Sequence, residues 1–170
     1  MVLVRNGIPQ PNEWVRIADD SPLPEGGKAI VSLKRWFAER ESLPAGKGEI
    51  GVVLSNDQSP ELLSADLDRL ALVALDFPKF TDGRAFSQAR LLREKFGYRG
   101  EIRALGQVLR DQYLFMLRCG IDSAEILDGK RADGYAEAMR EFSVWYQPAS
   151  DERPYVVRQR HNAPDRIAAQ

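Results

Sequence analysis

"ALVALDFPKFTDGRAFSQARLLREKFG", residues 71–97, contains the strand, the corner and the helix that decide the fold. Its first part, residues 71–77, is an almost continuous apolar run of the length that is typical of a buried strand. Pro78 then turns the chain, and residues 83–97 have the spacing of a helix, with Gly97 at the position that ends helices. A buried strand that leads directly into a helix predicts one β-α unit of a parallel sheet.

The same alternation recurs along the chain, with strands of five to seven residues followed by helices of ten or more. The predicted strands are residues 29–33, 49–55, 71–77, 101–105 and 123–127, and the predicted helices are 34–43, 59–70, 83–97, 107–120 and 134–146. We therefore expect one α/β domain over residues 1–147, with about five parallel strands. Apolar strands imply cover on both faces, which favours an open three-layer sheet; a partial β/α barrel completed by a second subunit is the alternative.

The two ends of the chain depart from this alternation. Residues 2–18 form two extended pieces separated by Asn6-Gly7 and two prolines, which predicts an N-terminal β-hairpin. Residues 148–170 are rich in proline and charge, so we expect a flexible tail, in which residues 155–157 could pair with a partner's sheet edge. The segment at 113–117 is apolar all round its helix, which is typical either of a central core helix or of a homodimer contact.

The composition excludes several classes of function. The formal charge of −1 lacks the basic excess of a nucleic-acid-binding protein. The apolar runs are shorter than the roughly 20 residues that span a bilayer, and the first residues do not resemble a signal peptide. We expect a cytoplasmic protein with neither a nucleic-acid nor a membrane partner.

Metal and thiol chemistry is limited by one cysteine and one histidine, Cys119 and His161. Neither a disulfide, a dithiol redox centre, a two-histidine metal site nor an iron–sulfur cluster can be built within one chain. A metal held by carboxylates alone is the alternative that the sequence leaves open, and no metal site is predicted. Cys119 falls in the last turn of its predicted helix, where the helix dipole raises a thiol pKa. This placement favours a structural cysteine.

Polar residues gather where the third predicted strand meets its helix. Asp76 ends the strand, Thr81 or Asp82 is placed to cap the helix, and Gly83 leaves room beside the backbone. Arg84 puts a positive charge in the first helical turn, where the helix dipole favours an anion. Its charge is therefore balanced either by a bound anion or by the neighbouring acids.

The next strand end repeats the pattern with Gly106, Arg110 and Asp111, and Lys130 follows the fifth strand. In α/β sheets, ligands bind beyond the carboxyl ends of the strands. These residues predict one binding rim for a small anion, such as sulfate, phosphate or a nucleotide phosphate. Neither the phosphate-loop motif nor the dinucleotide fingerprint occurs in the sequence.

Several of these segments resemble the bacterial domain-of-unknown-function family 934. The motifs that carry the resemblance are "VSLKRW" (31–36), "SND" (55–57), "FTDGR" (80–84), "ARLLRE" (89–94), "GQVLRDQ" (106–112) and "RCG" (118–120). The similarity extends over most of the chain up to about residue 146 and includes the predicted rim.

The resemblance implies a role in assimilatory sulfite reduction, because members of this family are encoded beside sulfite reductase. We expect an accessory protein that binds sulfite reductase or another enzyme of the pathway. A flavin- or NAD(P)H-dependent oxidoreductase and a non-catalytic dimeric scaffold are the alternatives. The family supplies no catalytic residues to transfer.

Overall fold

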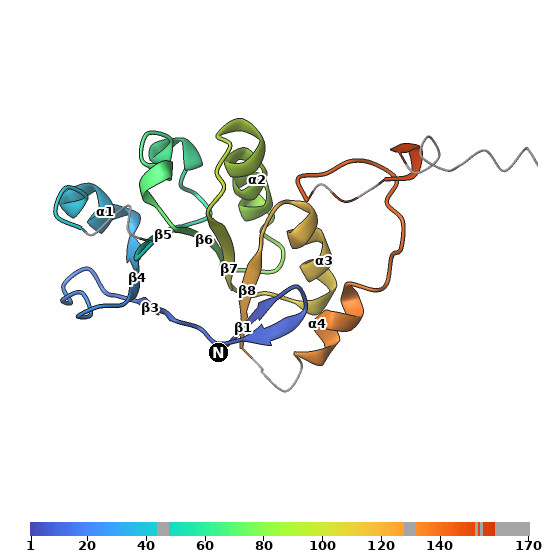
Figure 1. The fold of residues 1–170 in the computed structure, drawn as a ribbon, viewed down its shortest axis with the longest axis horizontal. Coiled ribbons are helices and arrows are strands. Elements are labelled where there is room, and N and C mark those ends of the chain that lie inside the picture. The colour runs from blue at the N-terminus through green and yellow to red at the C-terminus, as the bar shows by residue number, and fades with distance from the viewer. Residues whose placement is uncertain (44–47, 128–131, 152, 154, 159–170) are drawn as a thin grey trace, which may run out of the picture.

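The computed structural model describes residues 1–43, 48–127, 132–151, 153 and 155–158, in which strands and helices alternate (Figure 1). The strands are β1 (Val2–Arg5), β2 (Ile8–Gln10), β3 (Trp14–Arg16), β4 (Lys28–Ser32), β5 (Ile50–Leu54), β6 (Leu72–Phe77), β7 (Glu101–Gly106) and β8 (Ser123–Ile126). The helices are α1 (Leu33–Glu39), α2 (Arg84–Arg90), α3 (Arg110–Arg118) and α4 (Asp133–Ala138). Short turns of 3-10 or π-helix are η1 (Pro60–Leu63), η2 (Leu67–Arg69) and η3 (Leu91–Lys95).

All eight strands belong to one mixed sheet, in the order β2-β1-β8-β7-β6-β5-β4-β3. Strands β3 to β8 are parallel, whereas β1 is antiparallel to both β8 and β2. The α/β class is confirmed. The expectation of about five parallel strands is wrong, because the short strand β3 adds a sixth and the β1–β2 pair adds an antiparallel end.

The helices that the structure describes cover one face of this sheet. Strands β3 to β8 are neighbours in chain order without any reversal, and right-handed crossovers made in one direction put α1, α2 and α3 on the same face. Figure 1 shows the helices on the convex side of a curved sheet. The three-layer prediction is therefore wrong, and the molecule is a half-barrel, as the alternative of a partial β/α barrel proposed. The second subunit in that alternative stays a prediction.

The connection between the two edge strands requires the sheet to curve. β2 and β3 lie at opposite edges, yet only residues 11–13 join them. Four residue steps reach at most about 14 Å, whereas a flat sheet of eight strands would separate its edges by about 34 Å. The short linker therefore fixes the edges of the half-barrel close together.

The N-terminal hairpin is shorter than expected. Asn6 and Gly7 both have positive φ, at 51° and 73°, which a type I′ turn requires, so the hairpin closes within residues 2–10. The second predicted piece, now β3, pairs with β4 at the far edge instead of with β1. The expectation of a hairpin over residues 2–18 is corrected accordingly.

Each parallel strand contributes to two apolar layers. On β6, Val73 and Leu75 join the large core beneath the helices, whereas Leu72 and Ala74 pack on the other, concave face. Because both faces of a strand are packed in apolar layers, its sequence is continuously apolar. The same pattern had suggested a sheet covered by helices on both faces.

All five predicted helices are shorter in the structure, and two of them differ most. Residues 59–70 form the separate turns η1 and η2, because Asp66 between them accepts hydrogen bonds from the side chains of Trp36 and Arg40. The last helix ends at Ala138 instead of residue 146.

Beyond α4 the chain returns to α3. Arg118 donates to the Gln147 carbonyl and pairs with Asp151 at 2.8 Å, and its guanidinium lies 4.4 Å from the centre of the Trp145 ring. Within the predicted tail, Tyr155 forms a bridge with Trp145 of the same chain. His161 lies outside the described residues. In the part of the chain that the structure describes, every helix is too short or too polar to cross a membrane.

Candidate binding site at the strand ends

The corner that follows β6 lies at the carboxyl ends of the parallel strands. Asp76 is the last residue but one of β6, and loop 78–83 leads from it into α2. Phe77 anchors the corner beneath, since its buried ring packs edge-on against Phe86 of α2 at 5.1 Å. The loop therefore starts and ends on rigid elements.

Arg84 is balanced by Asp82. The two side chains form a two-pronged ion pair, with contacts of 2.7 Å (Nη2–Oδ2) and 3.0 Å (Nε–Oδ1). Asp82 also accepts the Arg84 backbone N–H at 3.2 Å and the Asn56 side-chain amide at 2.6 Å. Hydrogen bonds from Arg84 bring the pKa of the Asp82 carboxyl to about 2. The sequence left two explanations for what balances the charge of Arg84, a bound anion or a neighbouring acid. The structure shows the neighbouring acid, Asp82.

We predict that the Asp82 carboxyl titrates with a midpoint near pH 2 instead of its ordinary 3.8. Because the folded pKa lies below the unfolded one, the stabilisation by this carboxylate is fully present above about pH 4 and is lost as the pH falls towards 2. Carbon-detected NMR across this range measures the midpoint, and Arg84→Gln should raise it. A wild-type midpoint near 3.8 would show that the pair is absent in solution.

The loop itself is held by glutamine side chains from the next unit. The Gln107 side chain accepts the Phe80 backbone N–H at 3.2 Å, and the Gln112 side chain donates to the Phe80 carbonyl at 2.8 Å. The Gln107 backbone N–H donates to the Phe77 carbonyl at 2.7 Å. Although both backbone groups of Phe80 are fixed, its side chain is 56% exposed.

The two predicted glycines have different surroundings. Gly106 has φ +90°, and a Cβ there would lie 2.5 Å from the Phe77 carbonyl oxygen and 3.1 Å from an oxygen of Asp76. It permits the close approach of β6 and β7. Gly83, which precedes α2, has room for a side chain. Thr81 is exposed and makes no hydrogen bond to another described side chain or backbone group.

Arg110 and Asp111 lie apart from the other predicted site residues. Arg110 turns towards α4, where it donates to the Gly134 carbonyl and to Glu141, both at 2.9 Å. Asp111 lines a separate hollow beside Phe115 and Phe142. The structure thus gathers Asp76, Asp82, Arg84 and Gly106 at one corner, and Lys130 lies outside the described residues.

Cys119 is placed as a structural residue. It is buried, and this burial raises the pKa of its thiol to about 11. A thiol with that pKa has almost no thiolate at neutral pH, which is the reactive form. Among the described residues, no three His, Cys, Asp or Glu side chains are grouped as a metal site.

A hollow of about 660 Å³ lies beside the corner, between the ends of β7 and β8 and helix α4. Val108, Leu109, Leu127 and Tyr135 line it, and the Tyr135 hydroxyl donates to the Val108 carbonyl at 3.0 Å. Sequence reasoning missed Gln107, Leu127 and Tyr135. The one signal in the sequence was that these residues follow the ends of two apolar strands, β7 and β8, where ligands bind in α/β sheets.

These features define a β/α half-barrel with a polar, hydrogen-bonded corner and an apolar hollow at the carboxyl ends of its strands. A family model described as "Bacterial protein of unknown function (DUF934)" matches residues 51–156, more than half of the chain. The protein belongs to this family, and the matched region includes the corner and the hollow. Comparison with curated proteins gave no match.

Proposed function

We propose that this protein is an accessory protein of assimilatory sulfite reduction, which binds sulfite reductase or another enzyme of that pathway. The pathway comes from the sequence resemblance described above. The observation that carries the binding role is Phe80, an exposed aromatic side chain on a backbone that two glutamine side chains hold in place.

An exposed aromatic ring on a fixed loop has the properties of an interface anchor. Aromatic residues, phenylalanine among them, are enriched at protein interfaces relative to the rest of the protein surface. Because the Phe80 backbone is already ordered, binding loses less conformational entropy there than on a free loop.

Other residues at the same ends of the strands as Phe80 support a protein partner. Leu109 and Leu127, which follow the neighbouring strands β7 and β8, are also exposed. The charges of Arg84 and Arg110 are neutralised by Asp82 and Glu141. An apolar surface with balanced charges at its edge fits a protein surface better than a free anion.

A binding measurement with purified sulfite reductase tests the proposal. We expect Phe80→Ala to weaken binding by about 30-fold, the effect of losing an interface anchor worth about 2 kcal/mol. Phe37→Ala, which removes an exposed phenylalanine from α1, is the matched control and should leave the affinity unchanged. Absence of binding by the wild type, or equal losses in both variants, would contradict the proposal.

Sedimentation of the wild type alone checks the predicted homodimer.

A flavin- or NAD(P)H-dependent oxidoreductase is the second candidate, and the 660 Å³ hollow is the observation that favours it. Small-molecule sites have volumes of roughly 300–1,000 Å³, and active sites of β/α barrels lie at the carboxyl ends of the strands. Fluorescence titrations with FMN, FAD and NADPH test this role. Saturable binding that Leu109→Arg abolishes would favour it over the accessory role.

A further inference from the structure

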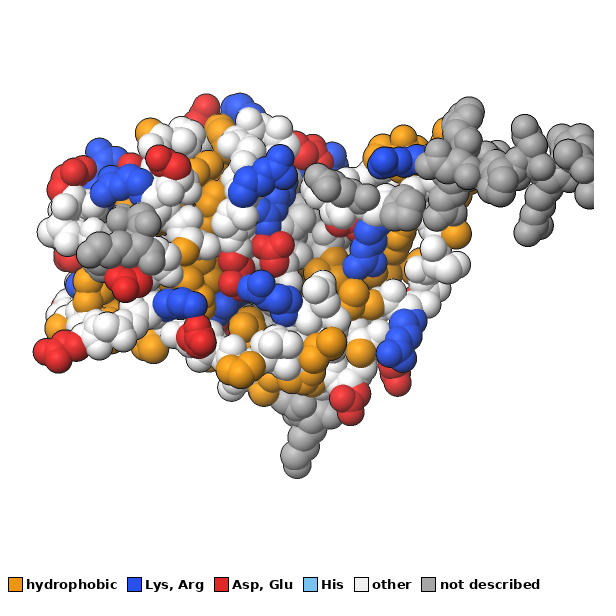
Figure 2. All heavy atoms as spheres, in the orientation of Figure 1, with side chains coloured by type: hydrophobic (Ala, Val, Ile, Leu, Met, Phe, Trp, Pro, Cys, Tyr) orange, Lys and Arg blue, Asp and Glu red, His pale blue; other side chains and the backbone are white. Residues whose placement is uncertain are grey.

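A third hollow, of about 470 Å³, lies at the other end of the half-barrel, beside the amino ends of β7 and β8. Four arginines line it from separate parts of the chain: Arg5 ends β1, Arg93 lies in η3, Arg99 precedes β7, and Arg153 follows the docked segment beyond α4. Figure 2 shows this face, where basic and acidic side chains gather near the centre.

The lining has an excess of positive charge. Among the described residues that line it, Asp122 and Asp151 are acidic, against four arginines. The chain as a whole has a formal charge of −1, so the excess is local. A concentration of guanidinium groups in a hollow is the usual means of binding phosphate or sulfate groups.

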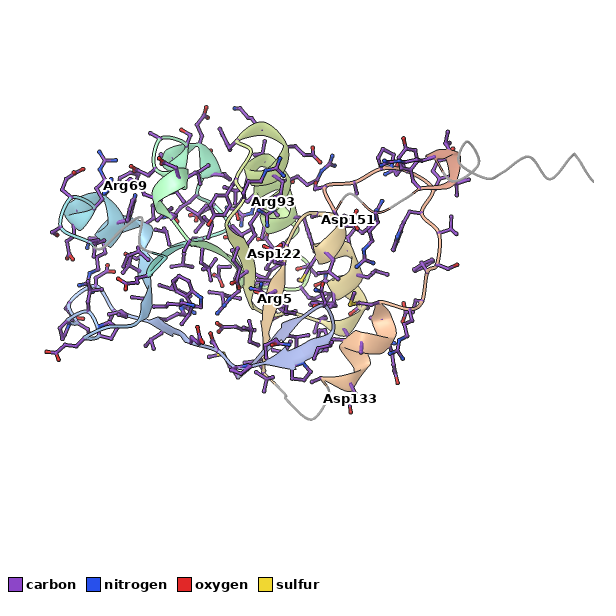
Figure 3. The ribbon with its side chains drawn as sticks, in the orientation of Figure 1. Arg5, Arg69, Arg93, Asp122, Asp133 and Asp151 are labelled. Atoms are coloured by element: carbon purple, nitrogen blue, oxygen red, sulfur yellow. The ribbon has the colours of Figure 1, made fainter. Side chains whose placement is uncertain are left out.

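Arg93 and Asp122 give this hollow a fixed floor. Arg93 donates to the carbonyls of Tyr98, Gly100 and Gly120 at 2.6–2.9 Å and pairs with Asp122 at 2.6 Å. Asp122 also accepts the backbone N–H of Ile102 at 2.7 Å. Figure 3 shows Arg93, Asp122 and Arg5 one below another on this face.

The other arginines retain capacity for a ligand. Arg99 is exposed and makes neither a hydrogen bond nor an ion pair with the side chains that the structure describes. Arg153 reaches Asp151 only at 3.4 Å, and the partly exposed Arg5 pairs through one nitrogen with Glu101 at 2.6 Å. Each therefore has N–H donors to offer, since a guanidinium has five.

We infer that this hollow binds the phosphate or sulfate group of a small anionic molecule. Its volume exceeds what one inorganic oxyanion fills and lies in the range of small-molecule sites. The inference concerns the opposite end of the strands from Phe80 and does not depend on the proposed function.

Calorimetric titrations with sodium sulfate, sodium phosphate and adenosine 5′-monophosphate, at constant ionic strength in sodium chloride, test the inference. We expect saturable binding that Arg99→Gln weakens at least tenfold. Arg16→Gln removes an exposed arginine from β3, outside the hollow, and should leave the affinity unchanged. Because the Arg99 side chain has no described partner, Arg99→Gln should fold normally.

Arg153→Gln provides a second variant, which should also weaken binding. Binding of adenosine 5′-monophosphate alone would identify an organic phosphate as the ligand type, and equal binding of the inorganic ions would identify a free oxyanion. Heat signals no larger than those of added chloride would overturn the inference. Equal losses in Arg99→Gln and Arg16→Gln would also overturn it.

Discussion

Replacing Arg103 with methionine is expected to lower the free energy of unfolding by about 3–5 kcal/mol, the effect of breaking a buried ion pair from one side. Arg103 lies on β7 and is 1% exposed. It pairs with Glu101 at 2.8 Å and with Glu125 at 3.1 Å, and it donates to the Asn12 side chain at 2.8 Å. Methionine fills the space but leaves Glu125 buried, with Asn12 as its one remaining side-chain partner among the described residues.

Chemical denaturation of three variants separates this electrostatic effect from packing. Arg103→Met/Glu125→Gln removes the uncompensated charge together with its partner and should recover a large part of the loss. Arg16→Met, at an exposed arginine of β3, should change stability by less than about 0.5 kcal/mol. A loss below about 1 kcal/mol in Arg103→Met would mean that the network contributes little to the fold.

Gly106→Ala is expected to lower the free energy of unfolding by about 2–4 kcal/mol, from backbone strain and overpacking together. The backbone φ of +90° is unfavourable for alanine, and the new Cβ would lie 2.5 Å from the Phe77 carbonyl oxygen. Because that oxygen belongs to the neighbouring strand, the pairing of β6 with β7 has to shift.

Gly83→Ala is the matched control for this variant. Its φ is −88°, and the nearest atom to a new Cβ is 3.7 Å away in the Phe86 ring, so alanine fits. Thermal unfolding of both variants should show a large loss for Gly106→Ala and almost none for Gly83→Ala. Equal effects would mean that β6 and β7 do not approach each other closely at Gly106.

The strands were predictable because each is an apolar run bounded by turn residues. The five predicted strands match β4 to β8 within one or two residues. The order of the strands in the sheet was not predictable from these runs. A continuous apolar strand fits a sheet that helices cover on both faces, and it fits equally well a barrel with an apolar concave face. The placement of β3 depends on pairing with β4, and neither its short sequence nor the hairpin before it encodes that partner.

The site was predictable only where its contacts are local. Asp82 and Arg84 are two residues apart, so their pairing was foreseeable from the sequence. Arg110 contacts Glu141, which is 31 residues away in the sequence. The sequence therefore could not show that Arg110 turns towards α4 and away from the corner with Asp82 and Arg84. The arginine-lined hollow is still less visible, because its residues come from positions 5 to 153 and share no motif.

The central claim, that the fixed loop with Phe80 is a docking surface, is tested most directly by hydrogen–deuterium exchange with and without sulfite reductase. We predict slower exchange at residues 78–83 and 107–109 in the complex, and unchanged exchange in α1. The Phe80→Ala variant should lose this protection at the same enzyme concentration. Protection elsewhere on the chain, with these two loops unchanged, would contradict the account.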